Sequence, residues 1–569
     1  MTRALLPALV LLGLLGLSAR FVALDCNPPS WLSRSAAPYI DEGYKLHSAR
    51  NQILFGAPAW SDLDEYEGGT GKLSIFKSAV VPVFRAFGVR LQPVRLLVAI
   101  LGGLSVLGLG ALIGWRFGLR WGIGAASFLA IDFVHIMFSR RALLEVPQAL
   151  CAIAVLGGLL ARGPTWMRAG LAIAGFALAY LTKASAILWF GAIIPGVLLC
   201  LAVRSLRSLD PAQRHRRLGQ LFLGGLLVVL LAYLLLFLMP HGFLERNWGD
   251  RSNVADPGSI LAENLLSSLS LQDPLLVAAG LVSSAFLLAR PLVAATPPGW
   301  LLLASWGLFG HLVLMGLSYN PLRYHIFLVP VFLATTVVFA CDAGRMGLHR
   351  LWSGYPRWAR RALRVVFFYA GASAGGGLCH ILGRRIPIGT RAGLTPTTSM
   401  LVGVIAAALA TALLLLAKRR LGERSGLRLH AGRIAAAVCV VLATSVSLGE
   451  MGAWWVSRSR SISEAGDRIA GVLPPGAIVA GPWAPMLCFE TPVRTLYLIP
   501  GLNESSLAKI RPTHFLFVST VEGEYLRDLF ETGRVPGLSG ISSILRAPID
   551  ERWHVILYSL RWDERHALN

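Results

Sequence analysis

Long apolar runs recur along the whole chain and constrain its fold more than any other feature of the sequence. The first run covers 4–24, and the others lie near 92–115, 121–138, 142–161, 168–182, 184–203, 219–239, 275–289, 299–318, 322–341, 363–382, 398–417 and 434–455. Each is close to the roughly 20 residues that a helix needs to cross a bilayer. The runs therefore predict a polytopic α-helical membrane protein with about 13 transmembrane helices.

The composition agrees with a membrane protein. Hydrophobic residues make up 55% of the 569 residues, charged residues make up 15%, and the mean hydropathy is +0.61. A soluble globule of this length needs more polar side chains to cover its surface. The net charge of +23 arises largely from arginines in short loops between the runs. This is the bias of cytoplasmic loops in membrane proteins, so it argues against nucleic-acid binding.

Three arginine-rich loops, near 204–217, 345–361 and 418–428, set the expected orientation. They fall on one side of the membrane if the spans alternate, and the positive-inside rule makes that side cytoplasmic. We therefore expect the first loop (25–91) and the tail on the outer face of the membrane. The excess of arginine over lysine favours a prokaryotic plasma (inner) membrane.

The tail, 457–569, differs in character from the transmembrane domain of residues 1–456. It combines a helical pattern with a Pro-Pro-Gly turn and short apolar strands, which predict a small extracytoplasmic α/β domain. The expected elements are a helix at 462–472 and strands at 477–480, 495–499 and 514–518. We interpret this domain as a cap or an acceptor-docking module. Cys26 and Cys488 should both face outward, either as a disulfide or as two free thiols.

The first outer loop contains an amphipathic helical pattern. Leu73, Phe76, Val80, Phe84 and Phe87 recur at helical spacing, while charged residues take the other faces. Such a helix is expected to lie in the membrane interface. There it can hold a lipid head group close to the carboxylates of the same loop.

Those carboxylates are Asp41 and Glu42, which open a second helical pattern containing Tyr44. A helix-start carboxylate paired with Lys45 one turn later would make Asp41 a structural residue. The alternative is a general base, because a carboxylate in a partly dehydrated cleft can remove the proton of an attacking hydroxyl. Glu42 would then orient Asp41 or bind a cation.

A second motif lies where the third span ends outside and the fourth begins. Arg141 and Glu145 are four residues apart, with Glu145 about one turn into the membrane. An acidic group there is costly unless it is paired or lines a wet cavity. An internal Arg141–Glu145 pair is the structural interpretation, and it leaves Arg140 unused.

Two further basic groups occupy short outer turns. Lys183 follows the fifth span, and Arg323 with Tyr324 precedes the tenth. Interface anchoring is the structural interpretation of both turns. However, Lys72, Arg140 and Arg141 are expected on the same outer face, where the positive-inside rule predicts few cations. One phosphate at head-group depth would account for all five groups, since arginine forks and lysine point charges bind phosphate. They would also stabilise a departing phosphate.

In these residues the chain resembles the GT-C glycosyltransferases that use polyprenyl-phosphate sugars, in the branch of protein O-mannosyltransferases and lipid A aminoarabinose transferases. The likeness rests on the Asp41-Glu42 pair, the segment Ser139-Arg140-x-Ala-Leu-x-Glu145, the Leu-x-Lys183 turn, and Arg323-Tyr324 followed by Pro330. It implies a catalytic role for Asp41 and donor-phosphate contacts from Lys72 and from Arg140 or Arg141. Some relatives bind a divalent cation near these carboxylates, and Glu67 could assist one here. No ligand spacing in the sequence demands a metal.

The favoured hypothesis is an inverting membrane glycosyltransferase of the cell envelope, a hexosyl or pentosyl transferase. It would move a sugar from a polyprenyl-phosphate carrier to an acceptor hydroxyl on a protein, a glycan or a lipid, with Asp41 as the general base. A transporter or flippase of a lipid-linked sugar is the alternative, and it predicts ionisable groups in mid-membrane, for which His311 is the best candidate. A non-catalytic assembly protein whose tail binds a partner is the third.

Overall fold

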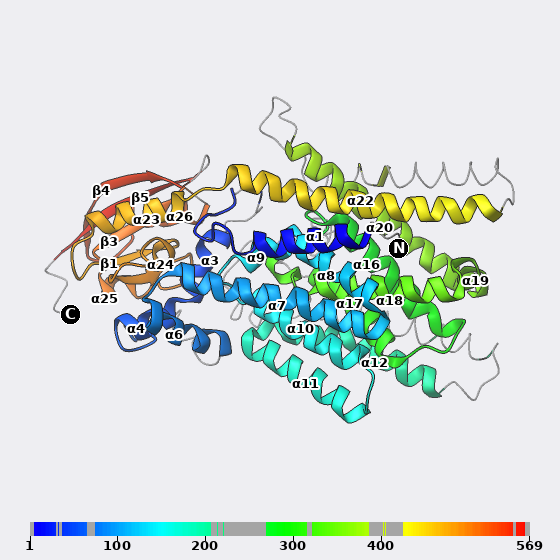
Figure 1. The fold of residues 1–569 in the computed structure, drawn as a ribbon. Coiled ribbons are helices and arrows are strands. Elements are labelled where there is room, and N and C mark those ends of the chain that lie inside the picture. The colour runs from blue at the N-terminus through cyan, green and yellow to red at the C-terminus, as the bar shows by residue number, and fades with distance from the viewer. Residues whose placement is uncertain are drawn as a thin grey trace.

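The computed structural model places a helical body at one end of the molecule and a small sheet-bearing unit at the other (Figure 1). The structure describes residues 5–29, 37–64, 74–205, 269–315, 321–385, 425–519, 521–549 and 553–563, together with positions 32, 213, 220, 402, 404 and 405. Apart from these isolated positions, the predicted spans 219–239 and 398–417 lie outside the described residues, as do Glu67 and Lys72.

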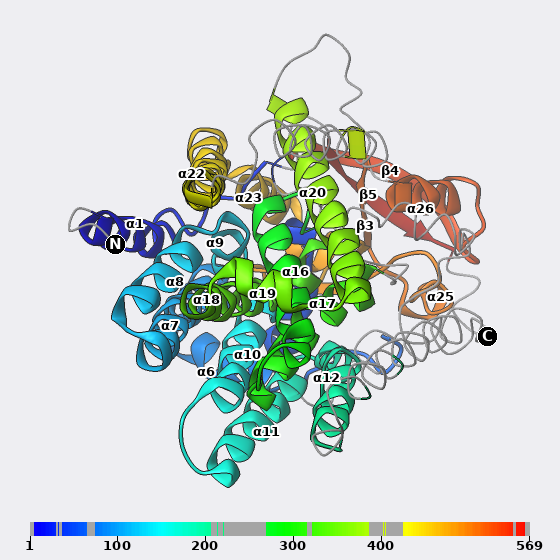
Figure 2. The ribbon, with the colours of Figure 1, turned by 90° about the vertical axis from the view of Figure 1, so that its right-hand side faces the viewer.

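The described helices of the body follow the apolar runs. They are α1 (Leu5–Ala19), α7 (Leu91–Phe117), α8 (Leu119–Ile131), α9 (Phe133–Ser139), α10 (Glu145–Leu160), α11 (Thr165–Thr182), α12 (Ile187–Ser205), α16 (Pro274–Ala289), α17 (Pro298–Met315), α18 (Leu328–Met346), α19 (Leu348–Gly354), α20 (Arg357–Arg385) and α22 (Ser425–Ser457). Short 3₁₀ turns are η1 (Ala184–Ala186), η2 (Arg290–Leu292) and η3 (Leu322–His325). Seen end-on, α16 and α18 lie near the centre and α11 and α22 at the rim (Figure 2).

Burial follows this arrangement. In the apolar segments of α17 and α18, 72% of the residues are buried, against 28% in the segment containing α12. Trp306 and Phe332 are fully buried in the central cluster. Helices at the rim instead keep apolar side chains on their outer faces, for example Leu198 and Leu201 of α12. This is expected when lipid, rather than water, surrounds the body.

Among the described residues, six helices are long and apolar enough to cross a membrane. A seventh span exists if α8 and α9, which meet at a 64° bend, are counted as one. The prediction of about 13 spans is therefore not confirmed at that number. One reason is length: α1 has 15 residues and α10 has 16, so both are shorter than the roughly 20 residues that a full span needs.

The tail forms a five-stranded mixed sheet with the strand order β2-β1-β3-β5-β4. Its elements are α23 (Ser461–Val472), β1 (Ile478–Gly481), α24 (Ala484–Leu487), β2 (Arg494–Tyr497), α25 (Leu507–Ile510), β3 (His514–Val518), α26 (Val521–Glu531), β4 (Leu538–Pro548) and β5 (His554–Trp562). Strand β1 pairs in parallel with β2 and with β3, whereas β5 pairs antiparallel with β3 and with β4. The helix and first three strands lie where the sequence predicts them, and the β4–β5 hairpin was not predicted.

The first loop carries α3 (Ala37–Lys45), α4 (His47–Leu54) and α6 (Ile75–Phe87). Figure 1 shows α3 between the sheet and the body, and α4 and α6 beside the sheet-bearing unit. The apolar stripe of α6 was predicted to lie in the membrane interface. In the structure Phe76, Val80 and Phe84 of this stripe are buried in the main core cluster, while Phe87 is 64% exposed. The inner part of the stripe therefore fixes α6 to the protein.

The sheet-bearing unit is bound tightly to this loop. Arg50 of α4 is fully buried and donates hydrogen bonds of 2.6 to 3.2 Å to four backbone carbonyls between 488 and 493. The Trp60 indole donates to the carbonyl of Thr495 on the edge strand β2. At Gly43 a Cβ atom would lie 2.5 Å from the backbone of Met486, so only glycine allows α3 to approach α24 this closely. The loop carboxylates thus have a rigid support.

Cys26 and Cys488 are both buried free thiols. The disulfide considered from the sequence is therefore absent, and the alternative of two free thiols holds.

Candidate functional site

Glu42 lies at the centre of a saturated hydrogen-bond network. Its two oxygens accept from Arg95 Nε at 2.9 Å and Nη2 at 2.5 Å, from Arg141 Nη1 at 3.3 Å, and from the backbone N–H of Ala142 at 2.6 Å. Asn27 accepts from both arginines through its side-chain oxygen. Glu42 is fully buried. A buried carboxylate is tolerated only with such compensation.

The pKa of Glu42 follows from this network. Burial alone would raise the pKa, but the charges of Arg95 and Arg141 and the hydrogen bonds from Arg95 and Ala142 outweigh it and hold the pKa below its usual value. The group is therefore an ionised carboxylate whose two oxygens are both engaged by donors. The Arg141–Glu145 pair considered as the structural interpretation is not formed, because Arg141 pairs instead with Glu42, 99 positions earlier in the sequence.

Asp41, the neighbour of Glu42 on α3, has different surroundings. It forms an ion pair with Arg323 of η3 and accepts a hydrogen bond from the hydroxyl of Tyr44. The expected partner, Lys45, instead lies 4.9 Å from the centre of the Tyr44 ring. Asp41 is thus held by one cation and one hydroxyl, both from side chains.

Glu145 and Lys183 form the next layer of the site. Glu145 begins α10, where the helix dipole favours a negative charge. Lys183 directly follows α11 and donates to Glu145 Oε1 at 2.6 Å. Arg323 Nε lies 3.8 Å from the same oxygen, and the Tyr324 ring lies 4.3 Å below the Lys183 ammonium. Four of the predicted site residues, Asp41, Glu145, Lys183 and Arg323, therefore form one continuous cluster.

Two lysines that were not singled out as site residues extend the cluster. Lys45 of α3 is half-buried, and Lys77 lies in the first turn of α6. Burial lowers the pKa of Lys45 to about 8. The positive charges of Lys183 and Lys77 also lower this pKa, whereas the negative charge of Glu145 raises it. The hydroxyl of Ser74, which caps α6, donates to the carbonyl of Thr182 and so joins the start of α6 to the end of α11.

Arg140 lies apart from this cluster. Its guanidinium donates to the carbonyls of Ala19, Val22 and Ala23 and stacks on Trp454 at 4.1 Å. These contacts tie the end of α1 to α9 and α22. Because its donors are occupied by backbone carbonyls, we leave Arg140 out of the phosphate site proposed below.

The sheet-bearing unit contributes one aromatic side chain to the site. Tyr497, at the end of β2, stacks on Tyr44 with a ring separation of 4.9 Å and an angle of 23°. Asn503 donates to the carbonyl of Tyr497 at 2.7 Å and to Asp64 of the first loop at 3.0 Å. The strand that carries Tyr497 is thereby fixed to the loop that carries Asp41.

No group of three or more metal-ligating side chains lies among the described residues. The oxygens of Glu42 are taken by arginines, and those of Asp41 by Arg323 and Tyr44. This donor set does not fit a divalent cation, so we derive no step through one.

The sequence contained a signal for one missed residue. Arg95 stands four positions into the apolar run that begins near 92, where an arginine is expensive unless it has a partner. That cost could have identified Arg95 as part of a buried network. No comparable signal pointed to Tyr497, which lies in a four-residue strand.

The overall fold matches solved structures. The chain is similar to ArnT from Cupriavidus metallidurans in the apo state, with 16% identity over 97% of this chain and 98% of that one and a TM-score of 0.50. For ArnT from the same organism bound to undecaprenyl phosphate, the identity is 17%, the match covers 96% of this chain and 97% of that one, and the TM-score is 0.48. The chain is also similar to archaeal oligosaccharyltransferase AglB from Archaeoglobus fulgidus, in complex with an inhibitory peptide and a dolichol-phosphate. The identity is 13%, the match covers 90% of this chain and 69% of that one, and the TM-score is 0.46.

The match to apo ArnT shows that the chain has the GT-C fold. No family model matches the chain. No curated protein matches it either.

Proposed function

We propose that this chain, which has the GT-C fold of ArnT, is a membrane glycosyltransferase. It moves a sugar from a polyprenyl-phosphate carrier to an acceptor hydroxyl on the extracytoplasmic face, with inversion. The observation that carries this proposal is the cluster around Asp41, in which cations from four different elements surround two carboxylates.

The charge balance of the cluster supports an anionic ligand. Lys45, Lys183 and Arg323 supply three positive charges, and Asp41 and Glu145 supply two negative ones, which leaves one positive charge in excess. Like charges brought together in a partly buried site are unfavourable unless an anion joins them. The phosphate of the donor is a diester with one negative charge, which matches this excess. The carrier phosphate that leaves is a monoester, which carries about −1.5 to −2 at neutral pH.

In the proposed reaction, the acceptor oxygen attacks the anomeric carbon of the sugar while the bond from that carbon to the phosphate oxygen breaks. The acceptor proton passes to Asp41, and the carrier phosphate leaves with the electron pair of the broken bond. The lysines stabilise the charge that develops on the phosphate. A single displacement of this kind inverts the configuration at the anomeric carbon.

The ion pair between Arg323 and Asp41 implies that the donor binds before Asp41 can accept a proton. Asp41 cannot readily accept a proton while Arg323 and Tyr44 engage its oxygens. An incoming donor phosphate competes with Asp41 for the guanidinium, which binds phosphate in a forked geometry. Donor binding would therefore release one carboxylate oxygen for the acceptor. Glu42 takes no part in proton transfer and instead holds α3 in place through Arg95 and Arg141.

The test uses purified protein in liposomes with a panel of undecaprenyl-phosphate-linked sugars and candidate acceptors. The proposal predicts release of undecaprenyl phosphate together with an inverted sugar linkage on the acceptor. Movement of intact donor between leaflets without release of undecaprenyl phosphate would support the transporter alternative instead. Binding of every donor without either reaction would support the assembly-protein alternative.

A further inference from the structure

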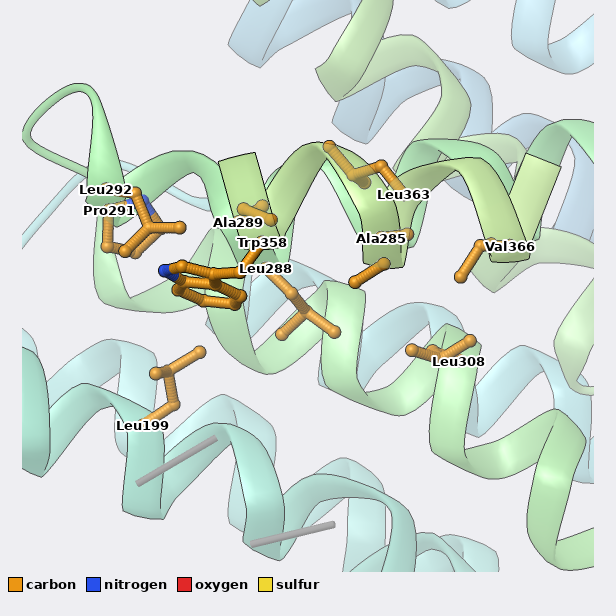
Figure 3. A pocket seen from close by; sticks show the side chains of 12 residues that line it. Leu199, Ala285, Leu288, Ala289, Pro291, Leu292, Leu308, Trp358, Leu363 and Val366 are labelled. Carbon is orange, nitrogen blue, oxygen red and sulfur yellow. The ribbon is translucent and has the colours of Figure 1, made fainter. Parts of the chain in front are cut away.

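Two features lie at the end of the helical body that is remote from α3 and the sheet. One is an apolar pocket of about 70 Å³ between α12, α16, α17 and α20, lined by Leu, Ala, Val, Pro and Trp (Figure 3). It contains no charged side chain and cannot select a ligand by charge. The other is a cluster of arginines, whose chemistry does favour one class of ligand.

The arginine cluster consists of Arg116, Arg162, Arg168 and Arg345, which come from four separate segments. Arg116 is in the last turn of α7, Arg168 in the first turn of α11 and Arg345 in the last turn of α18, while Arg162 lies between α10 and α11. Helix α10 packs against α7, α11 and α18, and these helices are neighbours in the end-on view (Figure 2). The charges of the other three arginines all act on Arg116.

No carboxylate balances these charges within the described part of the chain. None of the four guanidinium groups forms an ion pair with a described residue. Asp342, one turn before Arg345, is held at two points by Arg290. Asp and Glu are also absent from the sequence around the cluster, at 114–121, 159–170 and 343–364. Four positive charges therefore repel one another here unless an anion joins them.

The two inner arginines show where an anion would bind. Arg168 is fixed by donating from Nε and Nη2 to the carbonyls of Gly158 and Leu159, at 3.2 and 3.0 Å. Arg116 Nε is buried and has no hydrogen-bond partner among the described residues. A buried donor without an acceptor is unfavourable. The positive charges around this N–H favour an anionic oxygen as the missing acceptor.

The positive-inside rule explains the side of the membrane on which these arginines are expected, but not their convergence. Arg162 and Arg345 are exposed, so their long side chains are free to extend into water and away from Arg116. Their charges nevertheless act on Arg116. Sidedness alone would be satisfied by a dispersed arrangement.

The surroundings of the cluster place the anion at the level of the lipid head groups. Trp115 and Trp166 lie one and two residues from arginines of the cluster and are 60% and 76% exposed. Exposed tryptophans favour the membrane interface. Beyond them, Leu107 of α7 and Ile173 of α11 are exposed along the sides of the body, as expected of helices that face lipid. A lipid whose phosphate lies in the cluster would have its acyl chains beside these faces.

We propose that the arginine cluster binds the head-group phosphate of an anionic phospholipid in the leaflet expected to be cytoplasmic, which is the leaflet that carries anionic lipids. The charged oxygens of a phosphate diester are acceptors that arginine forks bind well. A soluble phosphate ester offers the same oxygens but lacks the chains that the exposed faces of α7 and α11 would contact. The site is separate from the cluster around Asp41 and does not depend on the function proposed for it.

The experiment is native mass spectrometry of the full-length protein, delipidated and then supplied with phosphatidylglycerol and phosphatidylcholine of identical acyl chains. The wild type should retain phosphatidylglycerol in preference to phosphatidylcholine. R162Q/R345Q changes only exposed positions and should lose roughly 30-fold of this preference, while R162K/R345K should keep most of it. In a separate titration, glycerol 3-phosphate should bind much more weakly than phosphatidylglycerol.

A matched control removes two charges at the same end of the body. Arg357 and Arg361 are exposed arginines of α20 whose charges are not among those that act on Arg116, so R357Q/R361Q should retain phosphatidylglycerol as the wild type does. Equal losses in the two glutamine variants would overturn the proposal, because general surface charge would then select the lipid. Equal retention of both lipids by the wild type would also overturn it. Binding of glycerol 3-phosphate as tightly as phosphatidylglycerol would exclude a lipid site in favour of a soluble phosphate ester.

Discussion

Asp41 and Glu42 are adjacent on α3, carry the same functional group and are both almost fully buried, yet their surroundings are opposite. Glu42 accepts hydrogen bonds from two arginines and a backbone N–H, so its oxygens are saturated. Asp41 has one ion pair and one hydroxyl, beside a group of lysines. The difference teaches that the number of fixed donors, rather than the residue type, separates a framework carboxylate from one whose partners can be exchanged.

The prediction with the largest expected effect tests the framework role of Glu42 by removing its charge. Glu42→Gln leaves Arg95 and Arg141 buried without a carboxylate, and breaking a buried pair in this way costs about 3–5 kcal/mol. We expect a large fall in the midpoint temperature of thermal unfolding. The control is Asp25→Asn, because Asp25 pairs with the exposed Arg460 and should cost less than about 1 kcal/mol. Equal, small shifts in both variants would contradict the framework role.

A second prediction tests the surroundings of Asp41 through Lys45. The charges that act on Lys45 are those of Lys183, Lys77 and Glu145, not those of the Glu42 network. Lys45→Met should weaken binding of undecaprenyl phosphate by roughly 10- to 150-fold, because a hydrogen bond to a charged group contributes about 1.5–3 kcal/mol. Isothermal titration in detergent measures this. Lys509→Met, on α25 of the sheet-bearing unit, is the control and should bind as the wild type does. An unchanged affinity in Lys45→Met would remove it from the phosphate site.

The same lysine gives a pH dependence. With its pKa lowered to about 8, Lys45 is charged below that pH and neutral above it. Affinity for undecaprenyl phosphate should therefore fall as the pH rises from 7 to 9. Lys45→Arg should bind equally well at both ends of this range, because an arginine keeps its charge. A flat wild-type profile would show that the charge of Lys45 does not contribute.

The smallest expected effect concerns the link between Asp41 and the sheet. Tyr497→Ala removes the ring that stacks on Tyr44, an interaction of about 0.5–1.5 kcal/mol, and should reduce turnover by several-fold. Tyr497→Phe keeps the ring and should remain close to the wild type. Phe530→Ala removes a stacked ring on the far side of the same unit. If Phe530→Ala reduces turnover as much, loosening of the unit explains the loss.

Much of this arrangement was predictable from the sequence. The apolar runs indicate the helices, and the sidedness of the loops places Asp41, Lys183 and Arg323 on one face, where the structure brings them together. Helical spacing also predicts the inner stripe of α6. These features follow from periodicity and local charge, which a single sequence displays.

The pairing within the site was not predictable in the same way. Spacing of four residues suggested Asp41–Lys45 and Arg141–Glu145, but local spacing carries no information about partners that lie far away in the sequence. Arg323 forms an ion pair with Asp41, and Arg141 forms one with Glu42. A buried charge needs an opposite charge beside it, and the fold supplies that charge from distant parts of the sequence. The contribution of Tyr497 was missed because it depends on how the edge strand docks on the first loop.

The most direct test of the division between the two carboxylates compares Asp41→Asn and Glu42→Gln in the same preparations. Turnover of an undecaprenyl-phosphate-linked sugar and the midpoint of thermal unfolding are measured for both variants. The account predicts that Asp41→Asn loses about 10²- to 10⁴-fold of turnover with the smaller change in stability, whereas Glu42→Gln shows the larger loss of stability and the smaller loss of turnover per folded molecule. Wild-type turnover in Asp41→Asn, or the same balance of losses in both variants, would contradict it.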